Sequence, residues 1–182
     1  RDLLKGEVRF MFQPGEEGFH GARFMLEDGL LGGTRDYPLP DAAFALHIMP
    51  TAQHGLIAGR AGPLLAAADQ LDIVVEGRGG HASLPHQTLD PVPVACQIVT
   101  ALQIMVTRQF DAHDPVIVTI TMIEAGTAHN VIADRVHLRG TMRSLSPGNR
   151  ARLADAVRLL AAGIAGAHGL TAEVTVTPGF PV

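Results

Sequence analysis

Two adjacent glutamates, Glu16 and Glu17, stand in the glycine-rich segment QPGEEGFHGA (residues 13–22), directly after an apolar run. Neighbouring carboxylates repel each other, and a turn gives neither of them a helix face or a strand ladder. A divalent metal ion offsets that repulsion. One carboxylate can bind the ion while its neighbour takes a proton from water whose pKa the ion lowers to roughly 7. A solvated acidic turn is the simpler interpretation, and for an isolated Glu-Glu pair it is the commoner one.

A second polar residue, His47, follows the apolar segment AAFALHI (residues 42–48), just before Pro50. A lone histidine in such a run is usually a hydrogen-bonded core residue. If the two apolar runs are neighbouring strands, Glu17 and His47 reach the same edge of a sheet and offer oxygen and nitrogen ligands suited to zinc, manganese or cobalt. A catalytic zinc site normally has three protein ligands, so this set is incomplete.

Composition restricts the class of protein. The chain has 182 residues, of which 47% are hydrophobic and 18% charged, enough apolar residues to bury a core. A net charge of -4 without a basic block argues against nucleic-acid binding. The single cysteine, Cys96, cannot form an internal disulfide, and the most apolar stretch (residues 92–106) is too short to span a membrane. The sequence predicts a cytoplasmic protein without a membrane or nucleic-acid partner.

Residues 1 to about 60 have the pattern of an α/β domain. Apolar runs predict strands at residues 8–12, 42–48 and 54–59, and residues 22–28 have helical composition ended by Gly29. Runs that are apolar on both faces are typical of a parallel sheet. The fold class predicted for this part is a partial mixed or parallel-sheet domain. Open α/β sheets of this kind bind their ligands in the turns that follow the strands.

A second pattern begins after the glycine-containing hinge at residues 59–69. Strands are predicted at 69–76, 115–123, 135–143 and 171–177. Helices are predicted at 91–108 and 147–167, each preceded by an N-cap residue and a proline, Asp90-Pro91 and Ser146-Pro147. The order βαββαβ is that of a ferredoxin-like module, an open antiparallel sheet with two helices on one face. The predicted domains are therefore residues 1–61, 62–177 and 178–182, the last returning to the first domain.

Several motifs occur in a specific order: FQPGEEGFHGA, ALHIMP, GRGGHASLPHQTLDP, AHNVIADRVHLRGTMRS and TPGFP. This combination resembles the metal-dependent amidohydrolases related to aminoacylase and bacterial carboxypeptidases, closest to the branch of hippurate hydrolase and the auxin–amino acid conjugate hydrolases. The resemblance covers nearly the whole chain. It implies that residues 62–177 are the lid, or dimerisation, domain of a homodimer. The family's other metal ligands lie in segments that this sequence lacks, so we expect a central fragment of the catalytic domain.

The resemblance also implies roles for six residues. Glu16 is the general base, and Glu17 and His47 are ligands of a probable pair of divalent ions (zinc, manganese, cobalt or nickel). His81, in GRGGHAS, reaches an active site, typically that of the partner subunit, and polarises the scissile carbonyl of a small N-acyl amino acid or amide substrate. Asn130 hydrogen-bonds the substrate, and Arg143 holds its carboxylate.

Each of the last three residues has a simpler interpretation. Without the resemblance, His81 would be a loop histidine in a glycine-rich segment where the backbone approaches another element closely, Asn130 a turn cap, and Arg143 a surface arginine. The rival to the enzyme is a non-catalytic remnant of the family, a module that dimerises or binds a small molecule without a full set of metal ligands.

Overall fold

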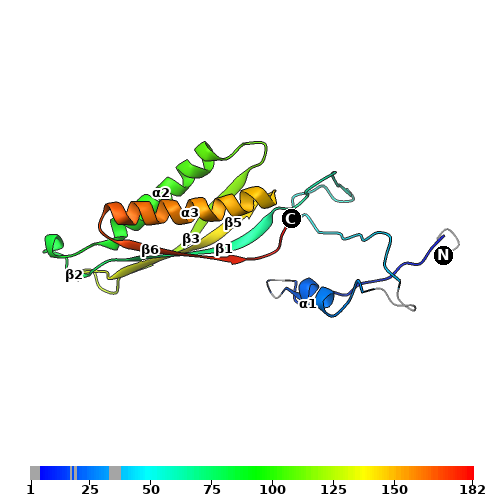
Figure 1. Cartoon of the computed structure of the whole chain (residues 1–182), viewed down its shortest axis with the longest axis horizontal. Coiled ribbons are helices and arrows are strands. Elements are labelled where there is room, and N and C mark those ends of the chain that lie inside the picture. The colour runs from blue at the N-terminus through cyan, green and yellow to red at the C-terminus, as the bar shows by residue number, and fades with distance from the viewer. Residues whose placement is uncertain (1–4, 17, 19, 33–37) are drawn as a thin grey trace. The chain divides into compact units, whose positions relative to one another are not determined.

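A computed structural model describes residues 5–16, 18, 20–32 and 38–182 (Figure 1). The chain divides into two compact units, residues 1–58 and residues 59–182. Each unit is described by itself below.

The second unit is a four-stranded antiparallel sheet with two helices on one face (Figure 1). Its strands lie in the order β3 (Val116–Ala125), β5 (Arg135–Ser144), β1 (Ala67–Glu76) and β6 (Thr171–Pro178). The helices that cover it are α2 (Pro91–Gln109) and α3 (Pro147–Ala167). The predicted βαββαβ module is confirmed, and every predicted boundary lies within two residues of the observed one.

The helices begin where their capping residues predict. The carboxylate of Asp90 accepts a hydrogen bond from the backbone N–H of Val92 (3.0 Å), and the hydroxyl of Ser146 accepts one from Asn149 (3.2 Å). Each cap satisfies a backbone donor that the first turn leaves free, and the proline that follows needs no such partner. Gly169, with φ 74°, follows the last turn of α3 in the left-handed conformation that glycine adopts without strain.

The core lies between the sheet and the two helices. Alternate residues of β1 and β5 point toward the helices and are fully buried, because side chains in a strand alternate between its faces. The opposite face of the sheet is polar, and there His137 of β5 contacts Asp72 of β1 (Nε2 to Oδ1, 2.9 Å). The residues at the centre of the core are Leu71, Ile73, Val75, Ile98, Leu102, Val136, Leu138, Leu153 and Val157.

A buried carboxylate fastens the end of this unit to its first strand. Asp69 is 5% exposed, and it accepts hydrogen bonds from Nε of Arg150 on α3 (2.9 Å) and from the backbone N–H of Gly179 (2.9 Å). The backbone N–H of Ala68 donates to the carbonyl of Phe180 (3.2 Å). Burial alone would raise the pKa of Asp69, but the hydrogen bonds from Arg150 and Gly179 outweigh it and lower that pKa below its ordinary value.

Two short strands were not predicted. β2 (Gly80–His81) and β4 (Val131–Ile132) form a separate two-stranded ladder, and the 3-10 helix η1 (Pro85–Gln87) follows β2. Two residues are too few to show a period of alternation, so neither strand leaves a pattern in the sequence.

In the first unit, the predicted helix is present as α1 (Gly21–Glu27). The strands predicted at residues 8–12, 42–48 and 54–59 are not formed: within the described part of this unit, no strand is present. Phe12 is 87% exposed and Phe44 is 95% exposed. A strand that is apolar on both faces needs paired neighbours and covering layers, and the described residues of this unit provide neither.

None of the helices in the described part of the chain is both long enough and apolar enough to cross a membrane.

Candidate active site

Glu16 lies in a turn between two glycines in the left-handed region, Gly15 (φ 57°) and Gly18 (φ 83°). The backbone N–H of Gly18 donates to the carbonyl of Glu16 (2.8 Å), and the side chain of Glu16 is exposed. Glu17, the predicted metal ligand, lies outside the described residues. The turn therefore presents the predicted base, Glu16, to its surroundings.

His47 is exposed, not buried as in the simpler interpretation. Its Nδ1 lies 2.7 Å from the carbonyl oxygen of Ile48. A carbonyl only accepts, so Nδ1 carries the proton and Nε2 keeps a free lone pair. Metal-binding histidines commonly have this arrangement, in which the other ring nitrogen donates to a backbone carbonyl. His47 therefore fits the role of a metal ligand through Nε2.

The described residues do not by themselves complete a metal site. They contain no group of three or more His, Cys, Asp or Glu side chains placed to hold an ion. His47 therefore remains a predicted ligand, and the other predicted ligand, Glu17, lies outside the residues that the structure describes.

His81 and Asn130 come together at the β2–β4 ladder. His81 pairs with Val131, the residue after Asn130, and the N–H of Ala82 donates to the carbonyl of Asn130 (3.0 Å). These residues are 49 positions apart in sequence, and the ladder makes them neighbours. The structure thus places the predicted carbonyl-polarising histidine beside the predicted substrate-binding asparagine.

The glycines before His81 let two backbone segments approach closely. A Cβ atom at Gly79 would lie 2.4 Å from the carbonyl oxygen of Ile132, and one at Gly80 would lie 2.8 Å from the methyl group of Thr88. The carboxylate of Asp134 accepts a hydrogen bond from the N–H of Gly79 (3.0 Å). The close backbone approach predicted for this segment is confirmed, and it holds His81 against the β4 strand.

The imidazole of His81 is exposed, and two groups of one residue contact it. The backbone N–H of Ser83 lies 3.2 Å from Nδ1, and the hydroxyl oxygen of Ser83 lies 2.8 Å from the same nitrogen. Sequence reasoning did not single out Ser83. The signal that was available was a hydroxyl residue two positions after a histidine in a turn, a spacing at which serine bonds locally.

Arg143 differs from the other arginines of β5. Arg135 lies 3.9 Å from a carboxylate oxygen of Glu76, and Arg139 contacts the carboxylates of both Asp72 (3.4 Å) and Glu124 (3.7 Å). Arg143 has no carboxylate partner among the described residues. Its cross-strand neighbours are apolar, Ala68 on β1 and Ile117 on β3. Its guanidinium is therefore exposed and available to an external anion.

The candidate residues of this unit lie at opposite ends of the sheet. Arg135 is the first residue of β5 and follows the β4 strand closely in sequence. Arg143 lies near the other end of β5, where it pairs with Ala68 at the start of β1. Eight residues of strand span about 27 Å. Figure 1 shows β2 at one end of the sheet and the C-terminus at the other. The structure therefore brings His81 and Asn130 together and separates both from Arg143.

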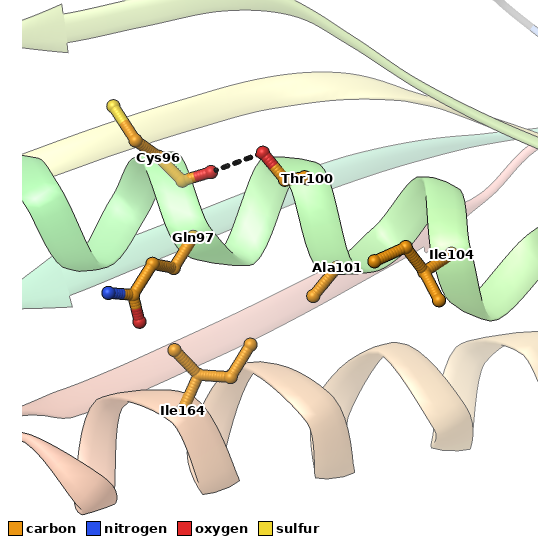
Figure 2. A pocket seen from close by; sticks show the side chains of 6 residues that line it. All are labelled: Cys96, Gln97, Thr100, Ala101, Ile104 and Ile164. Atoms are coloured by element: carbon orange, nitrogen blue, oxygen red, sulfur yellow. Dashed lines mark hydrogen bonds between the residues drawn. The ribbon is translucent and has the colours of Figure 1, made fainter.

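A shallow pocket of about 440 Å³ on the helical layer contains no predicted site residue. Figure 2 shows it between α2 and α3, with Gln97 directed toward α3 and the sulfur of Cys96 directed away from it. The hydroxyl of Thr100 donates a hydrogen bond to the backbone carbonyl of Cys96 (3.1 Å). The lining residues are Cys96, Gln97, Thr100, Ala101, Ile104 and Ile164. Since it lies on the helix face and lacks convergent polar groups, this pocket is no candidate for the site.

Comparison with known proteins identifies the family. Residues 67–168 match the family model of the M20 peptidase dimerisation domain. The match covers more than half of the chain, and it includes both helices and every strand of the second unit except β6. The chain therefore belongs to the M20 peptidase family, as its motifs predict.

Curated relatives and a solved structure match nearly the whole chain. It is 40% identical to thermostable carboxypeptidase 1 of Saccharolobus solfataricus over 176 residues, which are 96% of this chain and 43% of that protein. It is also 40% identical to N-acetylcysteine deacetylase of Bacillus subtilis over 181 residues, which are 100% of this chain and 46% of that protein. The chain thus spans less than half the length of these relatives.

The solved structure is that of the YXEP protein of Bacillus subtilis, described as a dinuclear metal-binding peptidase of the M20 family. It superposes with a TM-score of 0.71 at 34% identity, over 93% of this chain and 40% of that one.

Proposed function

We propose that the protein containing this chain hydrolyses the amide bond of N-acyl amino acids or related amino-acid conjugates at a site with divalent metal ions. The observation that carries the proposal is the free guanidinium of Arg143, the β5 arginine without a carboxylate partner in the described part of the chain. Two of the relatives are named as a carboxypeptidase and an N-acetylcysteine deacetylase, and a peptide C-terminus and N-acetylcysteine each carry a free carboxylate. A guanidinium binds such a group with two parallel hydrogen bonds.

His47 and Glu17 are the residues proposed to hold metal. The free Nε2 lone pair of His47 supports its part, and the dinuclear site named for the YXEP protein supports a pair of ions. Bound ions would polarise the amide carbonyl and lower the pKa of water at the site. Zinc, manganese, cobalt and nickel all accept this kind of ligand set.

The chain's own residues then supply proton transfer and orientation. Glu16, exposed in its glycine-bracketed turn, takes a proton from the attacking water and passes it to the leaving amine. His81 donates a hydrogen bond to the carbonyl oxygen as negative charge develops on it. Asn130, beside His81 on the β2–β4 ladder, hydrogen-bonds the substrate, and Arg143 fixes its carboxylate.

We further propose that one site uses residues from two chains. His81 and Asn130 lie about 27 Å or more from Arg143 along the sheet, and a single N-acyl amino acid cannot bridge that distance. A homodimer formed through the second unit resolves the conflict, since Arg143 of one chain and His81 and Asn130 of the other can then serve the same substrate. The match to a peptidase dimerisation domain supports this arrangement.

The roles of the two glutamates provide the test in the full-length protein. Glu16→Gln should lower turnover of N-acetyl and N-benzoyl amino acids by on the order of 100-fold or more and leave the metal content unchanged. Glu17→Gln should lower the metal content measured by mass spectrometry. Equal metal loss in both variants would refute this division of roles. Binding of N-acyl amino acids without turnover by the wild type would instead favour the non-catalytic interpretation.

A further inference from the structure

The hydrogen bonds of His81 determine which of its ring nitrogens carries the proton. The backbone N–H of Ser83 lies 3.2 Å from Nδ1, and a backbone N–H can only donate. Nδ1 must therefore be the acceptor. A neutral imidazole has one donor and one acceptor nitrogen, so the proton of His81 lies on Nε2.

The hydroxyl of Ser83 strengthens the same assignment. Its oxygen lies 2.8 Å from Nδ1, closer than the backbone nitrogen, and a hydroxyl rotates to donate wherever an acceptor is offered. The N–H of Leu84 donates to the carbonyl of His81 (2.9 Å) and closes the turn that brings Ser83 back onto the ring. Nε2 of His81 has no hydrogen-bond partner within the described residues, and its N–H is directed to the surroundings.

We propose that Ser83 is a positioning residue that keeps His81 in its Nε2–H form. This inference rests on the proposed function, in which His81 donates a hydrogen bond to the carbonyl oxygen of the substrate. In the Nδ1–H form, Nε2 would present a lone pair to that oxygen and could not donate. Ser83 touches neither the substrate nor the reacting atoms, and it acts through the imidazole alone.

The two predicted site histidines support this interpretation because they adopt opposite forms. Nδ1 of His47 contacts a carbonyl and is a donor, which leaves Nε2 as a lone pair for a metal ion. Nδ1 of His81 contacts an N–H and a hydroxyl and is an acceptor, which leaves Nε2 as a donor. In each case the local partner of Nδ1 produces the form that the proposed role requires.

Two substitutions separate the hydroxyl from the backbone contact. Ser83→Ala removes the hydroxyl and keeps the weaker N–H contact, whereas Ser83→Thr keeps both groups and is the matched control. Because Ser83 is exposed, neither change removes a core contact.

The direct measurement is a two-bond ¹H–¹⁵N correlation spectrum of the 182-residue chain with ¹⁵N-labelled histidine. It is recorded near pH 8.5, about two units above the ordinary histidine pKa. The wild type and Ser83→Thr should show a protonated Nε2 and an unprotonated Nδ1 for His81. Ser83→Ala should show both nitrogens shifted toward the averaged values of a mixture of the two forms. A protonated Nδ1 in the wild type, or an unchanged spectrum in Ser83→Ala, would overturn the proposal.

Turnover by the full-length protein provides the second measurement. Ser83→Ala should lower kcat about fivefold with KM little changed, since one hydrogen bond of ordinary strength is lost behind a group that acts on developing charge. Ser83→Thr should restore kcat, and failure to do so would count against the proposal. If His81→Ala retained full turnover, the proposed role of His81 would fail, while the ring spectra would still decide whether Ser83 sets its form.

Discussion

At the scale of single residues, the environment of a side chain separates functional candidates from structural ones of the same type. β5 carries three exposed arginines, and two of them contact carboxylates. The third, Arg143, lies between Ala68 and Ile117, neither of which neutralises it. The guanidinium charge of Arg143 therefore has no carboxylate partner within the described residues, and this sets Arg143 apart from the other two arginines of the strand.

Replacing Arg143 by lysine tests its proposed contact with the substrate carboxylate. Lysine keeps the charge but loses the planar pair of donors, so kcat/KM of the full-length protein should fall by a factor corresponding to roughly 1–3 kcal/mol. Discrimination between a free-acid substrate and its amidated analogue should also weaken.

Arg139→Lys is the matched control, because Arg139 lies on the same strand and the same face but already contacts Asp72 and Glu124. Its substitution should leave both quantities nearly unchanged. If Arg143→Lys and Arg139→Lys had equal effects, or if discrimination by Arg143→Lys stayed at the wild-type level, Arg143 would not belong to the site.

At the scale of elements, Asp69 joins three parts of the second unit: the start of β1, the first turns of α3 and the chain that follows β6. Asp69→Asn removes the charge from a buried ion pair with Arg150 and should lower the free energy of unfolding of this unit by about 3 kcal/mol. The exchange rates of the core amides of Leu71 and Ile73 measure that loss. Asp72→Asn, on the solvated face, should cost less than about 1 kcal/mol.

The same pair predicts a pH dependence. The folded-state pKa of Asp69 is lowered, so its carboxylate stabilises the fold fully above the unfolded-state pKa of about 3.9 and loses that contribution as the pH falls through the folded-state pKa. The wild type should therefore lose stability below about pH 4 more steeply than Asp69→Asn. Parallel acid-unfolding curves for the two proteins would contradict this assignment.

The edge strand β3 is the element expected to form the homodimer. Most residues in the later half of β3 are exposed, including Met122 and Ile123. β3 is also an edge strand, and the unpaired edge of a sheet can pair with a strand of another chain. The side-chain amide of Gln103 on α2 already donates a hydrogen bond to the carbonyl of Val118 (3.1 Å). The later half of β3 is therefore the part expected to pair with another chain.

Sedimentation at micromolar concentration should show a dimer for the 182-residue chain and a monomer for Ile123→Lys. Leu159→Lys is the control: Leu159 is also exposed, at 77%, but lies on α3, which packs over β6 at the other edge. A monomeric wild type, or dissociation caused equally by both substitutions, would argue against β3.

At the scale of the whole molecule, the chain taken alone should lack amidase activity and bind divalent metal weakly. Glu17 and His47 are only two predicted ligands, whereas a catalytic zinc normally has three protein ligands, and the described residues contain no group of three or more His, Cys, Asp or Glu side chains that could hold an ion. The pKa of water on a weakly held ion stays near 9, so Glu16 has no activated water to deprotonate at neutral pH.

Zinc titration calorimetry and an assay with N-acetyl and N-benzoyl amino acids test this prediction. A chain comprising residues 59–182 should still fold cooperatively, because every residue of the hydrophobic core lies within that unit. Stoichiometric, tight zinc binding with turnover by the 182-residue chain would show that the set of ligands is wrong.

The order of elements in the second unit was determined by the sequence because its signals are local. Asp90-Pro91 and Ser146-Pro147 mark helix starts through contacts with residues two or three positions away. Alternation along residues 69–76 and 135–143 marks strands that are buried on one face. These signals act over a few residues, and they agree with the fold.

The strands predicted at residues 8–12 and 42–48 show where local signals are insufficient. Their apolar pattern indicates burial on both faces, but burial depends on neighbouring strands and layers that a run of residues does not itself contain. Phe12 and Phe44 are consequently exposed in the described structure. The resemblance in the motifs predicted that Glu16 and His47 belong to one site. The sheet that would position them is not formed by the described residues of the first unit.

The tertiary structure alone decided how the candidate residues group. The β2–β4 ladder, too short to leave a pattern, places His81 beside Asn130, and the length of β5 separates both from Arg143. The form of the His81 imidazole depends on the path of the turn that returns Ser83 to Nδ1. The sequence determines which side chains are present. The path of the folded chain determines which of their atoms lie within hydrogen-bonding distance of one another.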